Sequence, residues 1–381
     1  MIELSTENLE RLRGQTDEVG DRVVAAIFEH HDLDSVNEVF RSLLTNSASP
    51  DALPPEAKEY FRGGEGLPAD ADRERIARAQ EVFTKYGPTL FMTLFCKSLP
   101  ECYSCWRGAE VLFRTGRMID DAPDFRNYSR RLMETAQFVL DVLVEGGLET
   151  DGRGLASIRK VRLIHASIRR YLLAQGWDRA TYGLPINQED EAGTLMSFSI
   201  TVLQGLEALG VRLEIDEKEA FVYTWALVGR LLGISADILP ATVAEAGTLQ
   251  DAILRHQVGP SEAGRVLTRS AIDYRAYLSP GTLFDTYPEA LMRYLVSPST
   301  AAAIGITGDP EHEELDRSLL DVYRFFNREI GDAEDHSSLV RGASGLFERH
   351  LLEGIFRHFA HVKKIHFYIP PSLRGAWRLE T

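Results

Sequence analysis

The sequence predicts an all-α protein. Apolar side chains recur at the three- and four-residue spacing of amphipathic helices along most of the 381 residues. Alternating β-branched runs bounded by turns, which indicate strands, are nearly absent. Short stretches rich in proline, glycine and polar residues separate the helical segments. Because 44% of the residues are hydrophobic, the chain can bury a large core, and these observations together favour helices packed on helices.

The first helical segment covers residues 20–45 and is interpreted as one or two helices. Two breaker stretches follow it, SASPDALPPEAK at 47–58 and FRGGEGLPADADRER at 61–75. They predict an N-terminal helical cap over residues 1–70 and a main all-α domain over residues 71–381, the two forming one continuous globular unit. The apolar positions that indicate the first helices are Val23, Val24, Ile27, Phe28, Val36, Phe40, Leu43 and Leu44.

From residue 73 onward, long segments with helical periodicity alternate with short loops. The final stretch, HFYIPPSLRGAW at 366–377, has no such periodicity and is expected to be irregular. The expected helices lie near 73–86, 88–98, 103–116, 124–146, 153–175, 188–210, 215–232, 243–256, 260–278, 285–295, 311–330 and 337–361.

Charge and hydropathy narrow the class of partner. A formal net charge of −15 argues against a nucleic-acid-binding protein, because phosphate contacts need clustered Lys and Arg. No apolar run approaches the roughly 20 residues that span a bilayer, and residues 1–23 lack the apolar stretch of a secretory signal. We therefore expect no nucleic-acid partner and no integral membrane segment, and a location in the cytoplasm.

The three cysteines, Cys96, Cys102 and Cys105, are too few for a disulfide framework. Cys102 and Cys105 have CxxC spacing, but no second such pair lies near them, and a structural zinc site needs four ligands. A redox dithiol and a pair of ordinary buried cysteines are the two interpretations that stay open.

The segment RKVRLIHASIRRYLL at 159–173 places His165 on an apolar helix stripe, with Val161, Ile168 and Leu172 on the same face. A lone histidine on such a face is more often a core histidine than a ligand. An imidazole that projects from an apolar face is also what a haem iron ligand requires. Arg169, one turn beyond His165 on the same side, adds the cation that a haem propionate needs.

Two further segments carry polar residues at helical spacing. In RRLMETAQFVLDVL at 130–143, Arg131, Thr135 and Phe138 share one face, and the simpler interpretation pairs Arg131 with Glu134 at the surface. In GLPINQEDEAGTLMSFS at 183–199, an asparagine followed by acidic residues is typical of a helix start. That start is a capping device, or it places Asn187 or Thr194 against a cofactor or against the His165 helix.

Together these segments resemble the latex-clearing protein (rubber oxygenase) family and its fungal relatives of the mpaB type, which cleave a prenyl side chain. The resemblance covers roughly residues 80–240. The segments that carry it are RRLMETAQFV, VRLIHASIRRYL, PINQEDEAGTLMSFS and EAFVYTWALVGRLLGI, the last at 219–234.

The resemblance implies a globin-like helical core around haem b, with extra helices at both ends, in the domain over 71–381. It implies that His165 is the proximal iron ligand and that Arg131 and Thr135 lie near the haem and are needed for activity. Arg169 is the candidate propionate partner, argued mainly from helix spacing. Some rubber oxygenases have a lysine where this chain has Glu134, so Glu134 is either a distal acid/base group or a surface residue.

The function that follows is a haem b-dependent oxygenase that uses O2 on an apolar, unsaturated small molecule of terpenoid or lipid type. A non-catalytic haem sensor or carrier would share His165 without a substrate channel. A cofactor-free helical scaffold is the third hypothesis, for which the purified protein would be colourless.

Overall fold

The computed structural model describes residues 2–31, 54–63, 66–116, 118, 125–278, 287–306, 317, 321 and 373. Within these residues the secondary structure is helical and contains no strand, which confirms the all-α class. The expected helices near 311–330 and 337–361 lie outside the described residues. The helices are α1 (Thr6–Leu12), α2 (Glu18–His30), α4 (Pro55–Gly63), α5 (Arg73–Thr93), η2 (Leu94–Ser98), α6 (Leu99–Ser104), α7 (Trp106–Thr115), α8 (Arg126–Leu143), α9 (Arg153–Ala174), α10 (Arg179–Tyr182), α11 (Gln188–Phe198), α12 (Ile200–Ala208), α13 (Ile215–Leu232), α14 (Val243–Gln257), α15 (Glu262–Leu278), α16 (Tyr287–Leu295) and α17 (Pro298–Ile304).

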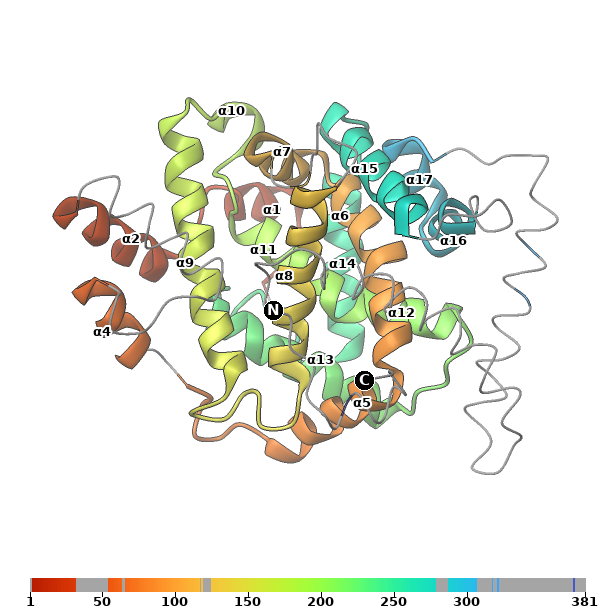
Figure 1. Cartoon of the computed structure of the whole chain (residues 1–381), viewed down its shortest axis with the longest axis horizontal. Coiled ribbons are helices and arrows are strands. Elements are labelled where there is room, and N and C mark those ends of the chain that lie inside the picture. Colours follow the sequence, from red (N-terminus) through yellow and green to blue (C-terminus); the bar gives the residue numbers. More distant parts are fainter. Residues whose placement is uncertain are drawn as a thin grey trace.

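The long helices α5, α8, α9 and α13 form the centre of the molecule (Figure 1). α15, α16 and α17 gather on one side, and α2 and α4 lie on the opposite side beyond α9. One large apolar cluster joins α5, α8, α11, α12, α13 and α14, and a second joins α6, α7, α15, α16 and α17. Leu9 and Leu12 of α1 belong to the first cluster. The division into 1–70 and 71–381 stays a prediction, as does the globin-like packing of the core.

A glycine-rich turn holds α8 and α9 side by side. Gly154 donates its N–H to the carbonyl of Gly147 at 2.8 Å. A Cβ on Gly147, Gly152 or Gly154 would lie within 3 Å of backbone atoms, so only glycine permits this close approach. The turn thereby places the two helices that carry Arg131 and His165 against each other.

The segment 73–104 differs from the expected pair of helices. Pro88 lacks an N–H, and a break was expected beside it. Instead α5 continues through Pro88, because its flanking residues are buried and the helix packs along α13. It then passes into a single π-helical turn, η2, a feature often found at functional sites.

The expected helix 188–210 is divided at Ser199 into α11 and α12. Ser199 has φ −105° and ψ −101°, outside the helical region, and its hydroxyl is buried. The division redirects the chain, so that α12 packs on α5 and η2 while α11 packs between α13 and α14.

Gly205 lies where α12 comes close to Thr93 of α5. We expect Gly205→Ala to cost about 1–3 kcal/mol of unfolding free energy, as overpacking does. Its Cβ would lie 2.1 Å from Cγ2 of Thr93, a stiff, fully buried side chain. The measurement is urea unfolding followed by far-UV circular dichroism.

Gly247 in α14 is the matched control, because a Cβ there meets nothing within 4 Å. Gly247→Ala is expected to stabilise by about 0.5–1 kcal/mol, since alanine loses less backbone entropy in a helix than glycine. Equal effects of the two substitutions would contradict the packing argument.

Candidate active site

A cavity of about 350 Å³ lies among α5, η2, α6, α7, α8, α9, α11, α13 and α14. This volume lies within the range of small-molecule sites. Its walls are predominantly apolar and include the aromatic side chains of Phe91, Phe95, Phe138, Phe198 and Trp225. Trp225 stacks on Phe198 with ring centroids 5.2 Å apart and is almost fully buried. The cavity is therefore suited to an apolar ligand.

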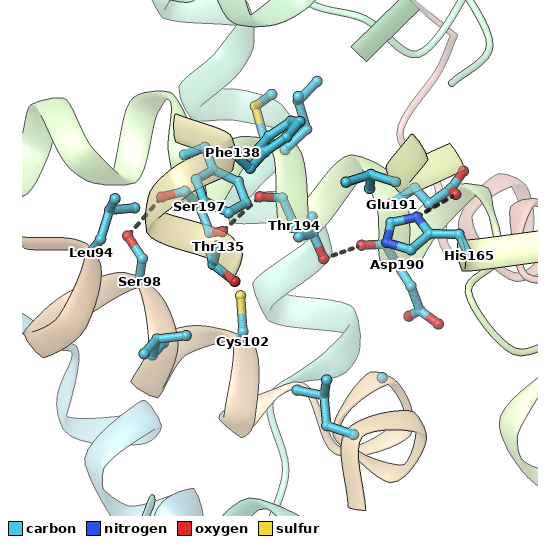
Figure 2. Close-up of a pocket in the computed structure, with 18 of the residues that line it drawn as sticks. Leu94, Ser98, Cys102, Thr135, Phe138, His165, Asp190, Glu191, Thr194 and Ser197 are labelled. Carbon is cyan, nitrogen blue, oxygen red and sulfur yellow. Dashed lines mark hydrogen bonds and ion pairs between the residues drawn. The ribbon is translucent and has the colours of Figure 1, made fainter. Parts of the chain in front are cut away.

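His165 projects from α9 into this cavity, with its side chain 24% exposed. Its Nδ1 lies 3.5 Å from Oε1 of Glu191 on α11. Figure 2 marks this pair with a dashed line. Nε2 makes no hydrogen bond or ion pair with any described residue. In the tautomer with the proton on Nδ1, Nε2 therefore has a free lone pair, which is what a metal ligand requires.

α11 lies along the cavity, and its start is the one the sequence predicts. Asn187 caps the helix by accepting a hydrogen bond from the backbone N–H of Asp190 at 3.0 Å. Glu191, Thr194 and Ser197 then follow one another along the wall at intervals of three residues (Figure 2). The acidic first turn, interpreted from sequence as a cap, thus also supplies the partner of His165, which sequence spacing did not indicate.

Arg131, Glu134 and Thr135 of α8 all line the same cavity as His165. Glu134 Oε1 lies 3.2 Å from Nε of Arg130, and Glu134 Oε2 lies 3.6 Å from Nη1 of Arg131. Thr135 donates its hydroxyl to the carbonyl of Arg131 at 3.1 Å. The pairing of Arg131 with Glu134 is therefore present, but it faces the cavity and is not an isolated surface pair.

The structure does not bring Arg169 to the cavity, contrary to the helix-spacing argument. Arg169 is almost fully buried and donates from Nε to Asp21 at 2.8 Å and from Nη1 to the carbonyl of Ile186 at 2.6 Å. Asp21 belongs to α2, which packs on α9. α9 packs against α2 as well as against α8. One turn beyond His165, the side chain of Arg169 therefore meets α2 and not the cavity.

Lys160 and Glu101 also line the cavity, and sequence reasoning missed both. Glu101 is buried and ion-paired with Lys97 four residues earlier, a spacing that the sequence does show. Thr201 and Gln250 donate to the second carboxylate oxygen of Glu101. This network holds η2, which contains Lys97, and α6, which contains Glu101, against α12 and α14.

The N-terminal segment is bound to the site by Arg13, another residue that sequence reasoning missed. Arg13 donates from Nη1 to Glu189 at 2.9 Å and to Asp190 at 2.8 Å. Glu189 has a fully buried side chain and also contacts Nδ1 of His256 at 2.6 Å. Burial raises the pKa of Glu189, while hydrogen bonds from His256 and Arg13 oppose this shift. The arginine thus compensates a buried carboxylate beside the cavity wall.

Cys102 and Cys105 are both free and both line the cavity. Burial raises the pKa of Cys102 to about 11 and the pKa of Cys105 well above its ordinary value. A redox-active dithiol depends on a lowered thiol pKa. The raised pKa values argue against a redox-active dithiol and favour the interpretation as ordinary cysteines, whose side chains are only partly buried on the cavity wall.

We expect Cys102 to react slowly with iodoacetamide in the folded protein. The thiolate is the reactive form, and raising the pKa from 9 to about 11 lowers its fraction near neutral pH roughly 100-fold. The labelling rate should rise about tenfold per pH unit toward that pKa. Mass spectrometry of a Cys96→Ser/Cys105→Ser variant measures the rate, with the urea-unfolded protein as control. Equal rates in folded and unfolded protein would contradict the raised pKa of this thiol.

The described residues contain no group of three or more His, Cys, Asp or Glu side chains arranged to hold a metal ion. None of the described helices is long and apolar enough to cross a membrane.

Known proteins resemble this chain in sequence and in fold. It is 24% identical over 306 residues to the rubber oxygenase of Streptomyces sp. (strain K30), across 78% of this chain and 72% of that protein. Its fold is similar to the structure of latex clearing protein LCP in the closed state, with a TM-score of 0.72 and 20% identity over 91% of each chain. The model of the catalytic domain of the ER-bound oxygenase mpaB/B′/rubber oxygenase family matches residues 104–334, more than half of the chain. This chain therefore belongs to the mpaB and rubber oxygenase family, as the resemblance of its motifs predicts.

Proposed function

We propose that this chain is a haem b-dependent oxygenase that uses O2 on an apolar, unsaturated small molecule of terpenoid or lipid type. The observation that carries the proposal is His165, whose Nε2 lacks a protein partner among the described residues while its ring lines an apolar cavity. Membership of an oxygenase family supports the reaction class, and the name of the relative from Streptomyces supports an unsaturated, apolar substrate.

The residues of the cavity fit haem b in three respects. His165 offers one imidazole nitrogen, and a porphyrin supplies four further nitrogens to its iron. The walls are apolar, as a macrocycle needs. Arg131 and Lys160 are cationic and line the cavity, so we propose them, in place of Arg169, as the groups that face the propionates.

When bound, haem b supplies a redox-active iron that activates O2. His165 would hold the iron, and the apolar walls would bind and orient the olefin and exclude water. We propose Glu134, held between Arg130 and Arg131, as the group that holds or releases a proton in the cavity. Arg131 contacts the second carboxylate oxygen of Glu134 and helps to hold it, and the Thr135 hydroxyl on the same helix donates to the carbonyl of Arg131.

The test begins with titration of the purified protein with haem b. We expect a Soret band that saturates at one haem per chain. Oxygen uptake is then measured with farnesol and, as a matched control, with the fully saturated hexahydrofarnesol. Oxygen consumption and carbonyl products with the olefin alone support an oxygenase of the proposed class.

The competing hypotheses give different results. A Soret band without oxygen uptake across a panel of terpenoid and lipid olefins would favour the haem sensor or carrier. No Soret band after addition of haem would favour the cofactor-free scaffold and contradict the proposed cofactor.

A further inference from the structure

A buried carboxylate lies beside the imidazole of His165 on the cavity wall. Oε1 of Glu191 is 3.5 Å from Nδ1 of His165, and the Glu191 side chain is only 5% exposed. Glu191 lies in the first turn of α11, after the Asn187 cap. Its position is therefore set by a capped helix start, and not by a loop (Figure 2).

The groups around Glu191 support its charged form only in part. Burial raises the pKa of Glu191, while His165 and Arg169 oppose this shift and Asp17 adds to it. Gln188 donates from Nε2 to Oε2 of Glu191 at 3.3 Å. A buried carboxylate is costly unless paired, and Oε1, the oxygen that faces His165, has the imidazole Nδ1 as its partner.

Arg169 gains an explanation from this arrangement. Its guanidinium is held by Asp21 and by the carbonyl of Ile186, and its Nη2 is buried without a hydrogen-bond partner. It lies close enough to Glu191 to favour the carboxylate electrostatically. Arg169, which the helix spacing assigned to a propionate, thus stabilises the Glu191 carboxylate that pairs with His165.

We propose that Glu191 is a positioning residue for His165. It accepts the Nδ1 proton and so holds the neutral imidazole in the tautomer whose Nε2 lone pair faces the cavity. Its negative charge also makes the imidazole a stronger electron donor to a bound iron. The claim about the tautomer concerns the haem-free protein alone. The claim about electron donation to iron rests on the proposed function.

The first test uses the haem-free protein labelled with 15N-histidine in alkaline buffer. Long-range 1H–15N spectra distinguish the two tautomers, and a His165→Gln variant assigns the resonance. Free histidine favours the proton on Nε2. Because Oε1 of Glu191 faces Nδ1, we expect wild-type His165 to carry its proton on Nδ1 instead. The Glu191→Leu variant should revert toward the tautomer of free histidine.

The second test uses the haem-loaded protein and the isosteric Glu191→Gln variant. Removing the negative charge is expected to favour ferrous over ferric iron at least about tenfold, a rise of about 59 mV in the one-electron reduction potential. The stretching frequency of the ferrous iron–histidine bond should fall, because the imidazole becomes a weaker donor. Glu191→Asp, which keeps the charge, should restore part of both values.

Glu189→Gln is the matched control, since Glu189 is equally buried but contacts Arg13 and His256 instead of His165. It should leave the His165 tautomer unchanged and move the potential clearly less. An Nε2 proton in the wild-type haem-free protein would overturn the inference even if haem binds. Equal potentials in wild type and Glu191→Gln would overturn its electronic half. A protein that binds no haem but shows the Nδ1 tautomer would contradict the proposed function and leave the positioning role supported.

Discussion

The His165→Ala variant is expected to lose its Soret band at haem concentrations that saturate the wild type. Replacement of a metal's outer partners already costs about 10–100-fold in affinity, and loss of the ligand itself should cost more. Among the described residues that line the cavity, His165 is the one histidine. Absorption spectra of the ferric and the ferrous carbon monoxide forms measure the effect.

Free imidazole provides a rescue that separates ligand loss from misfolding. Alanine at position 165 leaves a gap of imidazole size, so added imidazole should restore part of the band. His30→Ala is the matched control, because His30 is exposed on α2 and pairs with Glu56. Unchanged haem content and an unchanged carbon monoxide band in His165→Ala would show that the ligand assignment is wrong.

Arg13→Met is expected to destabilise the protein by about 3–5 kcal/mol. Arg13 is almost fully buried, and its loss leaves the buried carboxylate of Glu189 without its guanidinium partner. It also removes the ion pair with Asp190 and the hydrogen bond to the carbonyl of Tyr182. Urea unfolding monitored by circular dichroism gives the free energy of unfolding.

Arg11→Met is the control for this substitution. Arg11 lies in the last turn of α1, the helix that Arg13 follows as C-cap, but the Arg11 side chain is exposed, so its loss should cost about 0.5 kcal/mol or less. The double variant Arg13→Met/Glu189→Gln should be more stable than the sum of the two single changes predicts, because the unpaired charge is gone. Equal stabilities of the Arg11→Met and Arg13→Met variants would contradict the role of this ion pair.

The helices themselves follow from local sequence. Helix α9 at Arg153–Ala174 and helix α13 at Ile215–Leu232 agree within a residue or so with the expected 153–175 and 215–232. The Asn187 cap was also expected and is present. Helical periodicity and capping depend on residues within one or two turns, so a sequence pattern contains them.

Breaks within helices are harder to predict from the sequence than the helices themselves. Pro88 predicts a break that α5 does not show, and Ser199 shows a break that the sequence pattern does not predict. In both places the packing of neighbouring helices decides the outcome against local preference. The contact of Gly205 with Thr93 is of the same kind, since it depends on how α12 crosses α5.

The sequence by itself determined the all-α class, the family and the set His165, Arg131, Glu134 and Thr135, which the fold collects at one cavity. Tertiary structure alone decided the partners. It pairs Arg169 with Asp21, 148 residues away in the chain, and places Glu191 of α11 beside His165 of α9. The physical reason is that periodicity fixes which side chains share a helix face, whereas only long-range packing decides what covers that face.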